Sequence, residues 1–220
     1  MPIATKHGIK DTKHLVLATR NKHKIVEFFR LFKLHCPDVI LTDAAALGGM
    51  PDIREDAGSF LGNARLKARA LQSFLHTKVP IWAFSDDSGL CCDALKGLPG
   101  VDTANFAGLK ATDSANRAKL LKELRDVPDE KRTAHFICQL VLLASDGVEY
   151  SFSGICHGSI LREESGDGGF GYDSIFQADG TNCSFAVLPP EEKDAISHRG
   201  RAVASFAAWL AEQEVAREVG

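Results

Sequence analysis

The feature that most constrains the fold lies between Ala134 and Ile155, where two strand-like runs flank the dipeptide Asp146-Gly147. This dipeptide is preferred in type I′ turns, which join neighbouring antiparallel strands. The segment therefore predicts a long β-hairpin. Any sheet built around that hairpin contains antiparallel strands.

The first half of the chain follows a different pattern, in which strands and helices alternate. Residues 15–18 are a short apolar run typical of a buried strand, and residues 25–32 carry apolar side chains at helical spacing. A second strand is predicted near 39–41, and Ser59 is predicted to cap the helix that follows. Early alternation and a later hairpin together predict an α/β fold with a mixed sheet.

Size and charge limit the classes of function. The chain has 220 residues, of which 45% are hydrophobic, so we expect a single domain over residues 14–216 after a polar extension at 1–13. A net charge of -3 gives no long-range attraction to nucleic acid or to anionic lipid, so neither is an expected partner. No segment is long and apolar enough to span a bilayer.

The cysteines indicate the compartment. Six are present, none in a C-x-x-C pair and most inside apolar runs, which is typical of buried thiols in a reducing environment. The first thirteen residues lack the apolar stretch of a signal peptide. We therefore expect a cytoplasmic protein.

Residues 19–24 place a hydroxyl, an amide and basic side chains at the predicted strand-to-helix turn. Free backbone N–H groups and the helix dipole favour an anion there, so a triphosphate fits. The glycines and the G-K-[ST] ending of a P-loop are missing, and a P-loop nucleotidase or kinase is therefore not supported. Taken alone, an N-capped helix with solvated lysines is the simpler interpretation.

The most informative segment is Asp86-Asp87-Ser88-Gly89, which directly follows the apolar run 81–84. We expect a buried strand to end there, with both carboxylates at its end. Magnesium takes oxygen ligands and is commonly shared between one or two carboxylates and substrate phosphates. One aspartate would then hold the metal while the other orients or deprotonates water. The alternative is a turn whose aspartates accept backbone N–H bonds.

Other segments are weak when each is considered separately. Glu55 precedes a predicted helix, and Lys67 interrupts the apolar face of that helix. Residues 168–173 combine glycines with two aromatic rings on which a flat base can stack, and 197–199 supply hydrogen-bond donors. Solvated charges, a plain turn and a surface cluster are the respective alternatives.

Taken together, six ordered segments resemble the inosine triphosphate pyrophosphatase family along almost the whole chain. The motifs are T-x-N-x-x-K at 19–24, E-x(7)-N-A-x-x-K-A at 55–68, S-D-D-S-G-L at 85–90, L-x-G-x-P-G at 95–100, G-G-F-G-Y-D at 168–173 and E-E-K-x-x-x-S-H-R-G at 191–200. Chance agreement of all six in order is far less probable than any single match, so the resemblance outweighs the separate alternatives.

The resemblance implies an elongated, two-lobed α/β fold around a mixed sheet with flanking helices, a nucleotide cleft between the lobes, and a homodimer. It implies Mg²⁺ as cofactor, held by Glu55, Asp86 and Asp87, with Asp87 as general base. The turn residues expected to contact substrate are Thr19, Arg20, Asn21, Lys22, His23 and Lys24. The other substrate-binding residues that it implies are Lys67, Ser88, Phe170, Gly171, Tyr172, Asp173, Lys193, His198 and Arg199.

The implied activity is hydrolysis of faulty purine nucleoside triphosphates, those of inosine, deoxyinosine and xanthosine, to the monophosphate and pyrophosphate. Two alternatives remain: a Maf-like pyrophosphatase with another base preference, and a nucleotide-sensing module without turnover. Three positions depart from the family pattern. Ala57 stands where glycine is usual, Gly62 replaces a glutamate, and Ser174 replaces a proline. The lost glutamate removes a potential second metal contact.

Overall fold

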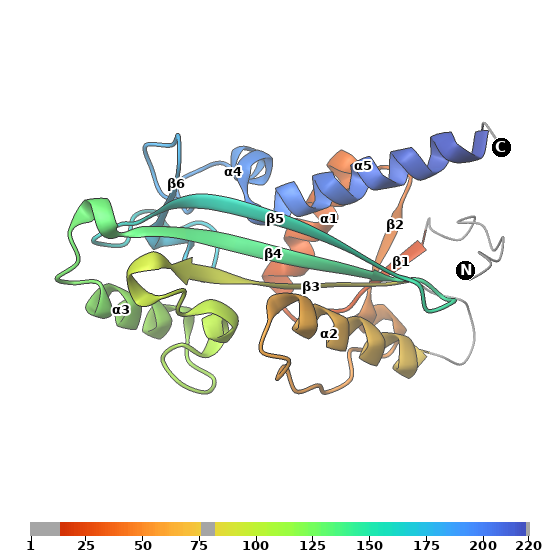
Figure 1. The fold of residues 1–220 in the computed structure, drawn as a ribbon, viewed down its shortest axis with the longest axis horizontal. Coiled ribbons are helices and arrows are strands. Elements are labelled where there is room, and N and C mark those ends of the chain that lie inside the picture. Colours follow the sequence, from red (N-terminus) through yellow and green to blue (C-terminus); the bar gives the residue numbers. More distant parts are fainter. Residues whose placement is uncertain (1–13, 76–81, 219–220) are drawn as a thin grey trace.

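Figure 1 shows the computed structural model, which describes residues 14–75 and 82–218. Its strands are β1 (His14–Leu17), β2 (Ile40–Asp43), β3 (Trp82–Cys92), β4 (Thr133–Leu143), β5 (Glu149–Ile160) and β6 (Phe176–Ala178). Its α-helices are α1 (Lys22–His35), α2 (Phe60–Leu75), α3 (Asp113–Glu123), α4 (Pro190–Ile196) and α5 (His198–Glu218). Short 3-10 helices are η2 (Ala44–Leu47), η3 (Asp93–Leu95), η4 (Gly100–Asn105), η5 (Asp129–Lys131) and η6 (Asp173–Ile175).

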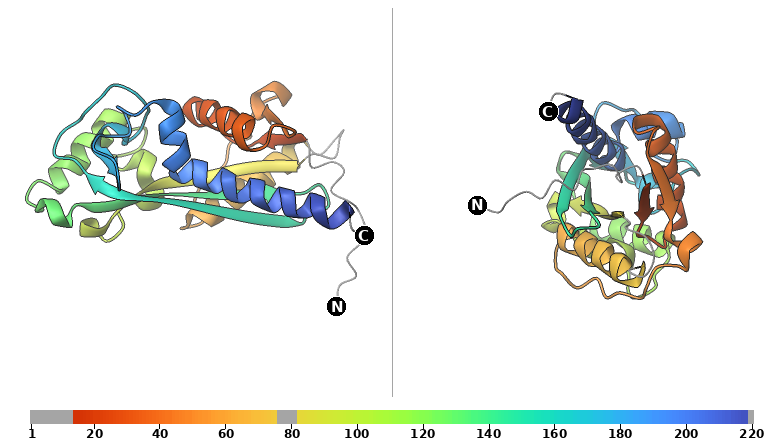
Figure 2. Two further views of the ribbon diagram at one scale, coloured as in Figure 1. Left: turned by 90° about the horizontal axis from the view of Figure 1, so that it is seen from above. Right: turned by 90° about the vertical axis from the view of Figure 1, so that its right-hand side faces the viewer.

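The strands form one mixed sheet in the order β2-β1-β3-β4-β5-β6, which confirms the predicted class. β1 pairs in parallel with β2 and with β3, while β3 to β6 pair antiparallel. The long strands β3, β4 and β5 run along an elongated molecule (Figure 1). The views from above and from the end show α1 and α5 together on one side of the sheet and α2 on the other (Figure 2).

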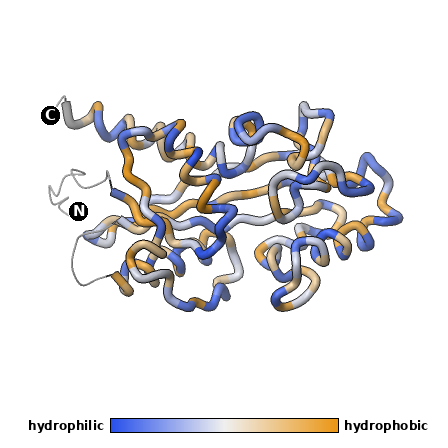
Figure 3. Tube along the Cα trace, turned by 180° about the vertical axis from the view of Figure 1, so that it is seen from behind, coloured by the Kyte–Doolittle hydropathy of each residue, from blue (hydrophilic) through white to orange (hydrophobic). Residues whose placement is uncertain are grey.

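The core is divided along the length of the sheet. At one end, α1 and α5 pack Phe28, Phe32 and Phe206 against one face, while α2 packs Ala68 and Leu71 against the other. A separate cluster at the opposite end joins α3 to residues of β3 to β6. Hydrophobic residues concentrate along the strands, and polar residues on the outer helix faces and loops (Figure 3). Among the described residues, no helix is long and apolar enough to cross a bilayer.

The predicted hairpin is confirmed, but its turn type is wrong. β4 and β5 pair over their whole length from Leu143 opposite Glu149. The connection is a three-residue loop, because Ala144 N–H donates to Val148 O and Gly147 N–H donates to Ala144 O. Within this loop only Gly147 has a positive φ, of 88°, whereas a type I′ turn needs two such residues. The glycine is therefore required, but as the last residue of a longer loop.

Predicted elements near the amino-terminal half are confirmed with small shifts. Asn21 caps α1, and Ser59 Oγ accepts a hydrogen bond from Gly62 N–H at the start of α2, as expected of an N-cap. Residue 81, which we placed in the third strand, and the extension 1–13 lie outside the described residues.

Candidate active site

The turn between β1 and α1 is closed by its own side chains. Asn21 Oδ1 accepts hydrogen bonds from the backbone N–H groups of His23 and Lys24, at 3.0 and 3.2 Å. Thr19 Oγ1 accepts one from Asn21 N–H at 3.2 Å. The capped helix start expected from the sequence is present, and it aims the Lys24 side chain at the carboxylate of Asp86.

The remaining turn residues point in different directions. Arg20 donates to Met50 O and pairs with the exposed Asp52 at 2.8 Å, so its guanidinium is turned toward the 50–52 segment. Lys22 is exposed, and no hydrogen bond or ion pair links it to the rest of the described chain. The His23 ring stacks on Phe170, with 5.0 Å between centroids. His23 and Lys24 therefore face the cluster described next.

The paired aspartates lie inside a strand, and the expectation of a strand end at residue 84 is wrong. β3 continues to Cys92, and residues 83–92 pair with β4 without a break. Because side chains alternate along a strand, Asp86 and Asp87 point to opposite faces of the sheet. Asp86 is fully buried and Asp87 is 6% exposed. The strand continues because β4 forms hydrogen bonds with its backbone, and because lysines on both faces of the sheet neutralise its carboxylates.

Asp86 faces α1 and α5. Lys24 Nζ and Ser88 Oγ donate to its Oδ2 at 2.8 and 3.1 Å, and Arg199 donates to Ser88 Oγ at 2.9 Å. Burial raises the pKa of Asp86, but the charges of Lys24, Arg199 and Lys67 outweigh it and lower that pKa to about 2. Asp86 is therefore permanently ionised. Its Oδ1 is buried without a partner.

Asp87 faces α2. Lys67 Nζ donates to Asp87 Oδ1 at 2.6 Å, and Asn63 Nδ2 donates to Asp87 Oδ2 at 3.3 Å. Burial raises the pKa of Asp87 above its ordinary value, despite the opposing charge of Lys67. Two neighbouring carboxyl groups thus have pKa values shifted in opposite directions. Such a pair can divide the roles of fixed charge and proton acceptor.

The Lys67 ammonium is the shared partner of two carboxylates. Besides Asp87, its ammonium pairs with Glu55 Oε2 at 2.7 Å and donates to Asp86 O at 3.1 Å. Burial lowers the pKa of Lys67, but the carboxylates, Asp87 foremost, raise it above its usual range. Glu55 and Asp87 therefore converge on one positive charge.

These oxygens fit a magnesium ion that is completed by water and phosphate. In residues 14–75 and 82–218, no three His, Cys, Asp or Glu side chains converge on one metal position. The two that share a cation are Glu55 and Asp87, while Asp86 lies on the other face of β3. Two carboxylates with open coordination positions are a usual magnesium arrangement. The role of Asp86 as a ligand stays a prediction.

A buried charge network joins α1, α4 and α5. Glu27 of α1 accepts from Lys193 Nζ at 2.8 Å through Oε1 and pairs with Arg199 through Oε2. Lys193 Nζ also donates to Asp173 Oδ2 at 2.7 Å. These four residues are each less than 9% exposed. The network places two cations beside Phe170, whose ring centroid lies 5.4 Å from Lys193 Nζ and 5.6 Å from the Arg199 guanidinium.

The glycine-rich loop is held in one conformation by Asp173. Asp173 Oδ2 accepts from Phe170 N–H at 2.8 Å as well as from Lys193. Gly169 has a φ of 70°, and a side chain there would collide with the Asp173 carboxylate. Gly171 N–H donates to Asp113 of α3 at 2.7 Å, and Tyr172 Oη donates to Thr103 O at 2.9 Å. The loop thus presents Phe170, while Tyr172 is buried beneath it.

His198 is a neutral buried imidazole. It stacks on Phe136 with 4.7 Å between ring centroids, and its Nδ1 has no partner. Burial, followed by the charges of Arg199, Lys193 and Lys24, lowers the pKa of His198 well below its ordinary value. The ring is therefore uncharged, and its unpaired Nδ1 lies buried rather than at an open surface.

Comparison with known proteins agrees with this geometry. Residues 15–209 match the sequence model of a family described as the Ham1 family. The chain belongs to the Ham1 family. A relative named dITP/XTP pyrophosphatase from Opitutus terrae is 48% identical over 89% of this chain and 97% of its own, and one of the same name from Geobacter sulfurreducens is 45% identical over 86% and 92%. The structure of the Staphylococcus aureus Ham1 protein superposes with a TM-score of 0.79 at 34% identity, covering 91% of this chain and 100% of that one.

For two residues of the candidate site in this Ham1 chain, the sequence analysis predicted no role. Glu27 connects Lys193 with Arg199, and Asn63 bonds to Asp87. A signal existed for each. Glu27 lies three residues after Lys24 on α1 and four before the buried Leu31, so it occupies the inner helix face. Asn63 precedes Lys67 by four residues and shares its face of α2.

Two of the three departures from the family pattern lie in contact with each other. A Cβ atom added at Gly62 would lie 2.6 Å from Ala57 Cβ and 2.9 Å from Ser59 Oγ. The methyl group of Ala57 therefore fills the space that a side chain at 62 would need. The absence of glutamate at 62 is linked to the alanine at 57.

We expect Gly62→Glu to destabilise the protein by about 1–3 kcal/mol, the usual effect of overpacking. Combining it with Ala57→Gly should recover most of that loss, because the clashing methyl group is removed. Thermal or urea unfolding of the two single variants and the double variant measures this coupling. If the double variant lost as much as the sum of the singles, the compensation would be refuted.

Proposed function

We propose that this chain hydrolyses the triphosphates of inosine, deoxyinosine and xanthosine to their monophosphates and pyrophosphate, with Mg²⁺ as cofactor, and so removes faulty purines from the nucleotide pool. The observation that carries the proposal is the pair Asp86 and Asp87, whose pKa values are shifted apart, among the cations Lys24, Lys67 and Arg199, of which the last two are buried. The names of the Opitutus and Geobacter relatives support the same substrate class.

At the phosphate end of the site, positively charged side chains would offset the negative charge of the polyphosphate. Lys24, held by Asp86, and Lys67, held by Asp87, would bind phosphate oxygens near the start of α1, where the helix dipole favours an anion. Glu55 and Asp87 would hold magnesium, which when bound would neutralise further charge on the reacting phosphate group. Catalysis would then be mainly positional and electrostatic.

Asp87 is the proposed general base. Its raised pKa brings it closer to the pH at which a base works, while Asn63 and Lys67 fix the orientation of its carboxylate. It accepts a proton from water as the water oxygen bonds to the phosphorus next to the scissile bridge. The bridging oxygen then leaves with the pyrophosphate.

At the base end, the site offers hydrogen-bond donors. The Lys193 ammonium and the Arg199 guanidinium lie beside the Phe170 ring, and Arg199 Nε and His198 Nδ1 are buried without a partner among the described residues. A keto oxygen at position 6 of hypoxanthine or xanthine can accept from such donors. The amino group of adenine cannot, and would leave buried donors unpaired. Discrimination against ATP would then need no change of pocket size.

Incubation of the purified protein with inosine triphosphate and Mg²⁺ tests the proposal. Inosine monophosphate and pyrophosphate are the expected products, with much slower turnover of ATP and pyrimidine triphosphates. Orthophosphate plus diphosphate would redirect the proposal to a phosphohydrolase. Preference for modified pyrimidine or ordinary nucleotides would favour the Maf-like alternative, and binding without turnover would favour the sensing module.

We expect Phe170→Ala to raise KM for inosine triphosphate by about tenfold with little effect on kcat, because stacking on a base contributes about 1–3 kcal/mol. Phe170 is partly exposed, and its stacking on the exposed His23 shows that the ring accepts a flat partner. Steady-state kinetics measures the change, and Phe29→Ala on the outer surface of α1 is the matched control. A fall in kcat at constant KM would assign Phe170 to another role.

We also propose a cytoplasmic homodimer that does not bind nucleic acid or membranes. All six cysteines are free thiols, as suits a reducing compartment. The net charge of -3 provides no attraction to polyanions. The nucleotide would lie among the charged residues of the candidate site, between the hydrophobic core at one end of the sheet and that at the other. Size-exclusion chromatography with light scattering tests the dimer.

A further inference from the structure

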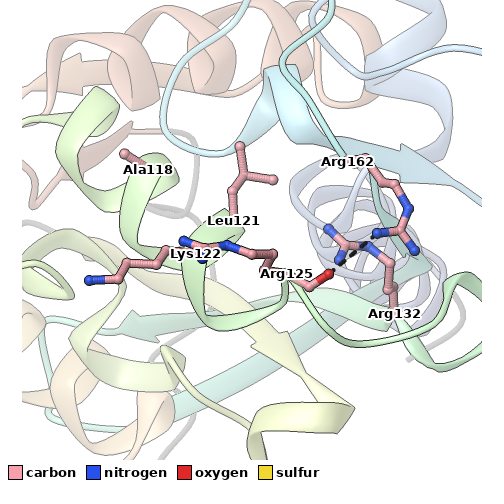
Figure 4. Close-up of a pocket in the computed structure, with 6 residues that line it drawn as sticks. All are labelled: Ala118, Leu121, Lys122, Arg125, Arg132 and Arg162. Atoms are coloured by element: carbon pink, nitrogen blue, oxygen red, sulfur yellow. Dashed lines mark hydrogen bonds between the residues drawn. The ribbon is translucent and has the colours of Figure 1, made fainter.

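A second charged region lies away from the candidate active site, against the outer side of α3. A cavity of about 480 Å³ opens there. Figure 4 shows its lining side chains, which are Ala118, Leu121, Lys122, Arg125, Arg132 and Arg162. None of them belongs to the cluster around Asp86 and Asp87. The cavity is therefore separate from the site proposed for the nucleotide.

The inner wall of the cavity is formed by Arg132, a positively charged side chain that is held in place. Arg132 is 2% exposed, and its guanidinium donates to the backbone oxygens of Leu124, Ile160 and Leu161. Burial, and then the charge of Arg162, lowers the pKa of Arg132. Its positive charge is thus held in place by neutral carbonyl groups rather than by a carboxylate.

The outer wall has more positive charge than its neighbours neutralise. Arg162 pairs with Asp129 at 2.8 Å, but Asp129 is 76% exposed, and exposed ion pairs are weak. Lys122 and Arg125 form no ion pair with any described residue, and neither side chain donates a hydrogen bond to one. Four basic residues therefore line one cavity, and among the described residues a single carboxylate, that of Asp129, pairs with any of them.

We propose that this cavity binds a small phosphate-bearing anion, either pyrophosphate or a nucleoside phosphate. The planar fork of an arginine matches phosphate oxygens, and Arg125 and Arg162 would donate to them together with Lys122. The volume lies within the range of small-molecule sites, and Ala118 and Leu121 provide an apolar wall for a sugar or base. The assignment does not depend on the proposed function.

Isothermal titration calorimetry in EDTA tests this site with pyrophosphate, inorganic phosphate, inosine monophosphate and sulfate as ligands. The double variant Lys122→Gln/Arg125→Gln should bind the preferred phosphate compound at least tenfold more weakly than the unmodified protein, because two charge-assisted contacts are lost. Lys33→Gln, an exposed change of the same type on α1, should leave binding unchanged.

The ligand series identifies the source of the phosphate. Tighter binding of pyrophosphate than of inosine monophosphate indicates the inorganic ion, and the reverse indicates a nucleotide; either supports the site. Amide NMR shifts confined to α3 and residues 125–132 would locate it. Equal affinities of the double variant and the unmodified protein would overturn the proposal, as would sulfate binding as tightly as every phosphate compound.

Discussion

Asp87→Asn should lower kcat for inosine triphosphate by about a thousandfold, with the nucleotide still bound. The asparagine keeps the shape of the side chain but cannot accept the proton of the attacking water, and general base catalysis contributes about 10²–10⁴-fold. The loss should be larger than that from most contact residues, since Asp87 also shares its cation with Glu55. Single-turnover kinetics and equilibrium binding of the substrate separate chemistry from affinity.

Asp56→Asn is the matched control for this prediction. Asp56 follows Glu55 in the chain, but its side chain is 59% exposed and pairs only with the exposed Arg54. Its substitution should change kcat by less than about twofold, since exposed pairs contribute little. Near-normal turnover by Asp87→Asn would remove Asp87 from the role of base, even if the products are those proposed.

Much of the fold was readable from local patterns. The hairpin, the first strand and helix, and the Ser59 cap all follow from periodicity and turn residues that act over a few positions. β3 was harder, because its polar residues 85–88 look like a turn when they are read alone. They remain in a strand because β4 pairs with every one of them and because lysines from α1 and α2 reach their carboxylates. Those partners lie far away in sequence.

The same limit applies to the candidate site. The motifs predicted which residues would gather, and the structure brings Lys24, Lys67, Phe170, Lys193 and Arg199 to the neighbourhood of the two aspartates. It turns Arg20 away, toward Asp52. The direction of a long, flexible side chain is decided by the partners that it meets after folding. A spacing pattern contains no information about those partners.

Glu27→Gln should strongly destabilise the protein. The carboxylate is the shared partner of Lys193 and Arg199, and all three side chains are buried. Removing one partner of a buried pair costs about 3–5 kcal/mol, because the other charge loses its compensation. For a domain of this size that corresponds to a fall in Tm of roughly 10 °C. Differential scanning calorimetry measures it.

The pH dependence distinguishes this mechanism from a packing defect. Burial raises the pKa of Glu27, but Arg199 and Lys193 outweigh it, so the pKa lies below the ordinary 4.5. A carboxyl group with a lowered folded-state pKa stabilises the protein fully above its unfolded pKa, and this stabilisation disappears as the pH falls through the folded-state value. The gap in unfolding free energy between the native protein and Glu27→Gln should therefore be constant above about pH 5.5 and narrow below pH 4.5.

Glu212→Gln, an exposed change of the same type on α5, should be stable to within about 0.5 kcal/mol at every pH. A gap for Glu27→Gln that stays the same from pH 7 to below the folded-state pKa would mean that the charge of Glu27 stabilises nothing. The network would then serve only to space α1 from α4. A narrowing gap would instead place the stabilising charge on the group that holds Lys193 and Arg199 beside Phe170, and would tie folding of this region to formation of the site that we propose for base recognition.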